Sequence, residues 1–184
     1  HDTISGYIIQ SILVKQVSII EKFLKSFYKY TQDKNEGEEP ISKQPSFIEK
    51  IKKYICNLLC VDIKEKKQFS DIKEIVTAIT KITKINIKEL DVDNWRQLRI
   101  MNELRNRFAH GSNEFVIRKE ILQELKREFG DNFVSEIKNE GNSYLCKIEN
   151  DFEPLMKFNN NMLDYMKQLE NEYKNNISKS VIYS

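Results

Sequence analysis

Glycine and proline are scarce in this chain, whose 184 residues include five Gly and three Pro. These two residue types most often end helices and form the turns between strands. A chain with so few of them suits long helices better than a sheet of many short strands. The composition therefore predicts a mostly α fold, and the length predicts one domain (residues 1–184) with a hydrophobic core of its own.

Apolar residues at helical spacing predict a long first helix and a long last helix. The first is expected from Tyr7 to Tyr30, and its buried face would consist of Ile8, Ile12, Val17, Ile20, Leu24 and Phe27. The last is expected from Asp151 to about Tyr173, with Pro154 in its first turn. Its buried stripe would consist of Leu155, Phe158, Met162, Tyr165, Met166 and Leu169. Residues 175–184 are expected to be a frayed tail.

Two further helices are expected after a polar surface loop. The loop, residues 32–45, contains Gly, Pro and adjacent Glu residues and is expected to be mobile. A capping box made of Ser46 and Glu49 would open a helix that runs to about Leu59. Ser70 is expected to cap the next helix, whose buried side would consist of Ile72, Ile75, Val76, Ile79 and Ile82.

A small β-hairpin is expected within residues 133–149, shortly before the last helix. Two strand-like stretches there flank the sequence N-E-G-N, in which Gly141 or an Asn can take a positive φ. A helix from about Arg118 to Phe129, ended by Gly130, would precede this hairpin. The predicted fold is therefore a helical bundle with long first and last helices and a small hairpin insertion.

Charge is distributed unevenly along the chain. The formal net charge of +2 is too small for a general nucleic-acid coat. Residues 50–88, however, carry ten Lys against four acids, and residues 120–172 carry twelve acids against six bases. This asymmetry is consistent with a basic face for RNA and an acidic flank, or simply with solvated helix faces.

The stretch from Asp93 to Gly111 combines helical and chemical signals. Asp93 or Asn94 can cap a helix that Gly111 ends. At about 100° per residue, Arg105 falls on the same arc as the apolar side chains of Trp95, Leu98, Met101, Phe108 and Ala109. A guanidinium in such a place is costly unless an anion or a hydrogen-bond acceptor meets it.

His110 stands at the end of the same predicted helix, and Asn102 and Asn106 lie on the edge between it and Arg105. An arginine, an amide and an imidazole at one helix end suit the binding and cleavage of a phosphodiester. A structural interpretation is open for each residue alone. A histidine in the last turn often caps carbonyls, and an arginine beside an apolar stripe often keeps its charged head in water.

The segment R-N-R-F-A-H-G, residues 105–111, resembles the R-x(4–6)-H motif of the HEPN superfamily, in the form where Asn follows the Arg. Many members of that family are metal-independent endoribonucleases built on a helical bundle, in toxin–antitoxin, abortive-infection and CRISPR-linked systems. The long first helix with an acidic residue and the long closing helix are similar to the small stand-alone proteins of the RiboL-PSP type.

The resemblance implies that Arg105 and His110 are the catalytic pair and that Asn106 orients the histidine or a phosphate oxygen. Arg107 would be an RNA-backbone contact or a surface ion pair. Glu21, an acid among apolar positions of the first helix, would either face the site and pair with Arg105 or form an ordinary ion pair. The second interpretation is slightly favoured.

RNA carries its own nucleophile, the 2′-hydroxyl, so cleavage needs a base, a proton donor and positive charge at the phosphorane. One histidine cannot easily be both base and acid, whereas a two-fold homodimer supplies two. RNA, a second copy of the chain and an antitoxin or regulatory protein are therefore the expected partners. No cofactor or metal is expected: the three Cys have no C-x-x-C spacing, and Asp91 and Asp93 are better explained as helix caps.

Other classes of function remain open. A non-catalytic HEPN-like module could use Arg105 and His110 to hold helix ends together while it binds RNA or a protein. A second class is the toxins paired with nucleotidyltransferases, which typically carry a Tyr two residues after the His. This chain has Ser112 there, which counts against regulation by adenylylation of that tyrosine. His1 in place of Met fits a trimmed tag or a domain of a larger defence protein. The apolar stretch near the N-terminus is too short and too polar to span a membrane, so a cytoplasmic location is expected.

Overall fold

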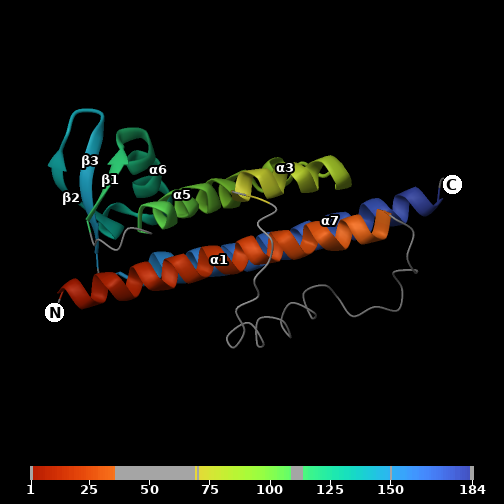
Figure 1. The fold of residues 1–184 in the computed structure, drawn as a ribbon, viewed down its shortest axis with the longest axis horizontal. Helices are drawn as coiled ribbons and strands as arrows, with labels where there is room; N and C mark the ends of the chain where they lie inside the picture. Colours follow the sequence, from red (N-terminus) through yellow and green to blue (C-terminus); the bar gives the residue numbers. More distant parts are fainter. Residues whose placement is uncertain (1, 36–68, 70, 109–113, 150, 183–184) are drawn as a thin grey trace. The chain divides into compact units, whose positions relative to one another are not determined.

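The computed structural model describes residues 2–35, 69, 71–108, 114–149 and 151–182 (Figure 1). Contacts group the chain into two compact units, and α1 and α7 run through both. The first unit comprises residues 1–18 and 92–163, and the second comprises residues 19–91 and 164–184. The predicted helix at 46–59 and most of the predicted loop at 32–45 lie outside the described residues, and the single-domain expectation stays a prediction.

Helices α1 (Asp2–Asn35) and α7 (Glu153–Ile182) each belong partly to both units. The first unit contains the early part of each of these two helices. Between them the chain forms α5 (Val92–Phe108), β1 (Glu114–Arg118), α6 (Lys119–Phe129), η2 (Asp131–Phe133), β2 (Val134–Asn139) and β3 (Ser143–Ile148). The second unit contains the later parts of α1 and α7 together with α3 (Ile72–Thr83) and α4 (Ile87–Leu90). A mostly helical fold with a small sheet is therefore confirmed.

The sheet has three antiparallel strands in the order β1-β3-β2 (Figure 1). The predicted hairpin of β2 and β3 is confirmed, and Gly141 takes the positive φ in its turn, at 80°. Strand β1 was not predicted; it pairs with β3 so that Phe115 lies opposite Cys146. Both of these side chains are buried on the face that α6 covers, where Lys126 forms an ion pair with Glu136 of β2 at 2.6 Å.

The buried stripe of α7 is confirmed at all six predicted positions. The predicted face of α1 is correct only for its later part. In the first unit Ile9 and Leu13 are fully buried, whereas Ile8 is 48% exposed and Ile12 is partly exposed. The physical reason is that apolar residues occur in adjacent pairs here, so two neighbouring faces of the helix satisfy the same periodicity.

Helix ends differ from the prediction in several places. Helix α7 continues through Ile182, past the predicted end at Tyr173, because no Gly or Pro interrupts it. Helix α3 is capped by Asp71, whose carboxylate accepts from the backbone N–H of Lys73, instead of by Ser70. Helix α5 starts at Val92, so Asp93 lies in its first turn and is not its cap. Gly130 ends α6 as predicted, with φ at 91°.

Several aromatic rings of the second unit pack against one another. The ring of Phe27 is stacked on Phe23 at 6.1 Å and meets the edge of Tyr173 at 5.4 Å, and Tyr173 also contacts Tyr30. The hydroxyl of Tyr165 donates a buried hydrogen bond to the backbone carbonyl of Ile87 in α4. Burial, followed by the neighbouring Tyr30, raises the pKa of Tyr173 to about 12. Burial among these rings therefore favours the neutral form of the Tyr173 phenol.

Candidate functional site

The last turn of α5 carries the first half of the predicted motif. Helix periodicity places Arg105 between Leu98 and Met101, both of which are fully buried, while Arg105 itself is partly exposed. Its Nε and Nη2 atoms donate to Oδ1 of Asn106 at 3.3 Å each. The structure therefore brings Arg105 and Asn106 together at the helix end, with the guanidinium directed toward an acceptor instead of into the core.

Asn102 and Arg107, the two other polar residues of this helix that the sequence associated with the site, lie on two different sides of it. Asn102, one turn before Asn106, is buried with 5% of its surface exposed. Arg107 is exposed and forms an i,i+4 ion pair with Glu103 at 2.7 Å. A surface ion pair is one of the two roles expected for Arg107, and contact with RNA stays a prediction.

Phe108 anchors the end of α5 to the sheet. Its ring meets the edge of Phe115 in β1 with centroids 5.2 Å apart and planes at 86°, and both residues are buried. Trp95, expected on the same apolar arc, is partly exposed. His110 and its neighbours, residues 109–113, lie outside the described residues, so the position of the imidazole stays a prediction.

Glu21 belongs to the second unit, in the later part of α1. Its carboxylate forms an i,i+4 ion pair with Lys25 at 2.8 Å, and both side chains are partly exposed. This agrees with the ordinary ion pair that the sequence slightly favoured for Glu21. Its supporting role in catalysis stays a prediction.

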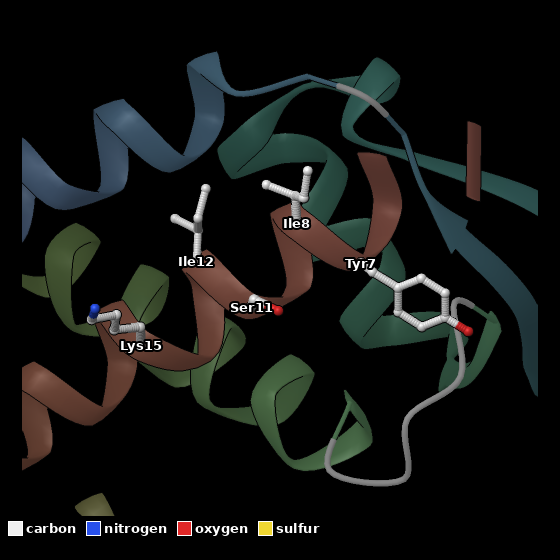
Figure 2. A pocket seen from close by; sticks show the side chains of 5 residues that line it. All are labelled: Tyr7, Ile8, Ser11, Ile12 and Lys15. Carbon is white, nitrogen blue, oxygen red and sulfur yellow. The ribbon is translucent and has the colours of Figure 1, made fainter. Parts of the chain in front are cut away.

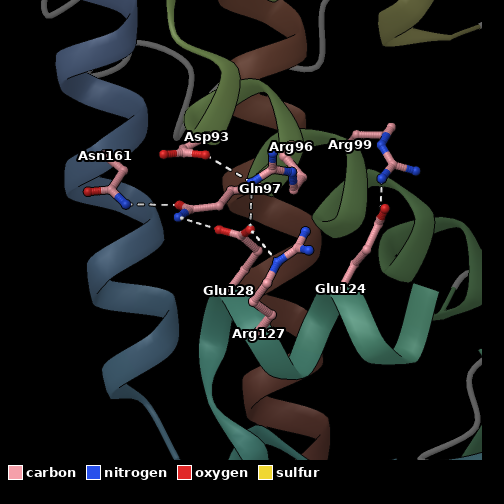
Figure 3. A network of polar contacts seen from close by, with 8 residues as sticks. All are labelled: Asp93, Arg96, Gln97, Arg99, Glu124, Arg127, Glu128 and Asn161. Carbon is pink, nitrogen blue, oxygen red and sulfur yellow. Dashed lines mark hydrogen bonds and ion pairs between the residues drawn. The ribbon is translucent and has the colours of Figure 1, made fainter. Parts of the chain in front are cut away.

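A polar network that the sequence did not reveal joins α5 to α6 and α7 (Figure 3). Nη1 of Arg96 lies 2.9 Å from Asp93 and 3.0 Å from Glu128. Nε2 of Gln97 donates to Glu128 at 3.4 Å, and Oε1 of Gln97 accepts from Asn161 of α7 at 2.8 Å. Three helices of the first unit are thus connected through one carboxylate and one amide.

The same face of α5 carries a second ion pair, from Arg99 to Glu124, and Glu128 also meets Arg127 at 3.4 Å. The spacing of these charged residues along the sequence is the signal that could have indicated the two ion pairs. The arginines stand three residues apart on one helix and the glutamates four apart on another, so each pair faces one side. Which helix faces which, however, cannot be read from spacing within either helix.

The carboxylate of Glu128 is the centre of this network, and only 10% of its side chain is exposed. Burial by itself would raise the pKa of Glu128. Hydrogen bonds from Arg96 and Gln97 and the charge of Arg96 outweigh that effect, and the pKa lies below its usual value. The hydrogen bond to Glu128 in turn raises the pKa of Arg96. The network is therefore ionised and holds its hydrogen bonds near neutral pH.

A shallow hollow of about 380 Å³ lies on α1 and is lined by Tyr7, Ile8, Ser11, Ile12 and Lys15 (Figure 2). All five side chains come from one helix, and Ile8 and Ile12 point to the same side of it (Figure 2). The lining contains no carboxylate, imidazole or thiol. This surface can contact an apolar group, but it lacks a general acid or base.

Within the described ranges, no group of three or more His, Cys, Asp or Glu side chains could hold a metal ion. Across the same part of the chain, none of the helices has the length and apolarity needed to cross a membrane.

Searches against models of known families, curated proteins and solved structures found no significant match to this chain.

Proposed function

We propose that this chain is a metal-independent endoribonuclease of the HEPN type, with a HEPN-like helical bundle as its fold. It would cut RNA by attack of the 2′-hydroxyl at a composite site of a homodimer, in a prokaryotic defence or toxin system and in the cytoplasm. The observation that supports this most is the hydrogen-bonded pair of Arg105 and Asn106 at the end of α5, which stand five and four residues before the histidine of the motif.

In this proposal Arg105 neutralises the charge that develops on the phosphorane. The guanidinium is suited to this role because it stays charged and its planar fork matches two phosphate oxygens. It is partly exposed, and one of its acceptors is the neutral amide of Asn106, which a phosphate oxygen can replace. Asn106 then becomes available to orient the phosphate or the imidazole.

His110 serves as the general base or the general acid, and its counterpart in the second copy serves as the other. The base takes the proton of the 2′-hydroxyl, whose oxygen attacks the phosphorus. The acid gives a proton to the 5′-oxygen as its bond to phosphorus breaks. The products are a 2′,3′-cyclic phosphate and a free 5′-hydroxyl, so the reaction consumes no water and needs no bound metal.

The alternative is a non-catalytic module that binds RNA or a protein partner. The exposed apolar hollow on α1 favours this alternative, because a binding surface accounts for it more readily than a catalytic site does. Tight partner binding by a purified protein that cleaves no RNA would support it over the ribonuclease. An antitoxin or regulatory protein is a proposed partner under either function.

The test compares the wild type with His110→Ala and Arg105→Ala on a mixed RNA pool, with and without EDTA. A general acid–base group contributes about 10²–10⁴-fold to the rate, so we expect a loss of that size for His110→Ala. Removing one group that stabilises developing charge costs about 10²–10³-fold, so we expect a loss of that size for Arg105→Ala, and no effect of EDTA on the wild type. Lys167→Ala, which removes a cation paired with Asp164 on α7, should cleave like the wild type. Full activity of His110→Ala would contradict the proposal.

A further inference from the structure

The buried apolar side chains of α5 cover a broad arc, and Phe108 anchors its last turn to Phe115 of the sheet. Two of the seven buried residues of α5, Gln97 and Asn102, are polar. At about 100° per residue, the buried apolar ones extend from Ile100 around to Leu98 and cover almost half of the helix circumference. A small rotation of the helix would therefore leave most of this surface buried.

Within the polar network, Arg96 lies on the opposite side of α5 from Arg105, and Gln97 lies among the buried positions. Arg96 precedes Arg105 by nine residues, which at about 100° per residue places the two guanidinium-bearing positions on opposite sides of the helix. Arg96 and Gln97 are held by Glu128 of α6, and Gln97 is held by Asn161 of α7 (Figure 3). Hydrogen bonds are directional, so these contacts resist a small rotation of the helix.

We propose that Glu128 is a positioning residue, which holds α5 in the rotation that directs Arg105 and Asn106 to the scissile phosphate. The inference rests on the ribonuclease function proposed above. Glu128 accepts hydrogen bonds from Arg96 and Gln97 through different oxygens, and its side chain is mostly buried. Fixing two adjacent residues on α5 constrains both its rotation and its position along its axis.

The consequence for catalysis is geometric. A displacement of about 1 Å at a reacting group can lower a rate by up to about 10²-fold. Because the network is more than two helical turns from the motif, its loss would change the direction of Arg105 without removing any group that contacts RNA. The chemical step should therefore be affected more than the binding of RNA.

The test uses Glu128→Gln, which keeps the shape of the side chain and removes its charge, in the full chain. Glu124→Gln is the matched control, because Glu124 lies one turn earlier on α6 and pairs with Arg99 at a more exposed place. Two quantities are measured in folded protein: the NMR resonance of the Arg105 Nε–H group, and kcat and KM for RNA cleavage.

We expect Glu128→Gln to shift the Arg105 resonance and to lower kcat about tenfold with little change in KM, and Glu124→Gln to do neither. If Glu128→Gln does not fold, Gln97→Met carries the same test, because it removes the hydrogen bonds to both Glu128 and Asn161. An unchanged resonance, or an unchanged kcat in an active protein, would overturn the positioning role alone.

An inactive wild type would instead overturn the ribonuclease proposal. The Arg105 resonance still decides in that case whether Glu128 controls the end of α5. A shift would support the coupling, and its absence would refute it.

Discussion

Each compact unit contains ring contacts, and the first also has a polar network that joins three of its helices. In the second unit Phe23, Phe27 and Tyr173 pack ring against ring, and the one buried carboxylate identified there, Glu170, pairs with Lys174. In the first unit α5 is held by buried apolar side chains, such as Phe108 against Phe115, and also by charged and amide side chains, among which Glu128 is central. Apolar burial is non-directional, whereas hydrogen bonds constrain orientation.

The difference suggests separate roles for the two units. Substitutions inside the second unit should change the free energy of unfolding, and substitutions in the network of the first should change geometry at the end of α5. The exposed large apolar side chains found among the described residues also belong to the first unit, and they include Tyr7, Ile8, Val116 and Met156. Surfaces for partners are therefore expected on the unit that carries the motif.

The largest stability effect should come from Phe27→Ala in the second unit. Phe27 is fully buried and contacts two other rings, and removing such a ring costs about 3–5 kcal/mol. Urea denaturation should show this loss, while kcat per folded molecule stays near the wild-type value. The matched control is Ile8→Ala on the same helix, where the side chain is 48% exposed and the cost should be below about 0.5 kcal/mol. If Phe27→Ala lowered kcat as much as is expected for Glu128→Gln, the proposed difference between the two units would be contradicted.

The stability that the polar network of the first unit contributes should decrease at acidic pH. The pKa of Glu128 is lowered in the folded state, so the charged form is the one that folding favours. Its contribution is complete above the unfolded pKa of about 4.3 and is lost as the pH falls through the lower folded pKa. We expect the wild type to be about 1–3 kcal/mol more stable than Glu128→Gln near neutral pH, and this difference should shrink on acidification. A difference that does not depend on pH would contradict the ionised network.

The response to alkali should distinguish the second unit. Burial raises the pKa of Tyr173 to about 12 and also raises the pKa of Tyr165, so folding favours the neutral phenols. This contribution is present below the unfolded pKa of about 10 and is lost as the pH rises through the folded value. In the wild type, part of the rise in phenolate ultraviolet absorbance should therefore occur only above the pH at which ordinary tyrosines ionise. Tyr173→Phe should remove part of this high-pH change. Titration of all tyrosines near the ordinary value would contradict the buried ring cluster.

The smallest effect is expected from Glu124→Gln. Its pair with Arg99 is about one-third exposed on both sides, and such pairs contribute about 0.2–1 kcal/mol. The loss should also decrease at high salt, because exposed charges are screened. A cost equal to that of Glu128→Gln in thermal unfolding would show that burial does not separate the two ion pairs.

Much of the fold could be predicted from the sequence because helical periodicity is a local property. The stripe of α7 and the hairpin turn at Gly141 are examples. The face of early α1 was wrong because Ile8 and Ile9 are both apolar, and only the packing decides which one is buried. Strand β1 was missed because its five residues gain their meaning from pairing with β3.

The candidate site shows the same limit. Arg105 and Asn106 could be singled out because they are adjacent and belong to a short motif. The contacts of Glu128 with Arg96 and Gln97 join residues about thirty positions apart, and no spacing rule connects two such helices. The motif residues were therefore accessible from the sequence, whereas the residues that hold their helix were not.

The most direct test of the central proposal is the identity of the new RNA ends formed by purified wild type in the presence of EDTA. Attack by the 2′-hydroxyl predicts a 2′,3′-cyclic phosphate on one fragment and a 5′-hydroxyl on the other, and neither should form with His110→Ala. Fragments that carry a 5′-phosphate, or cleavage that stops when divalent ions are chelated, would contradict the account.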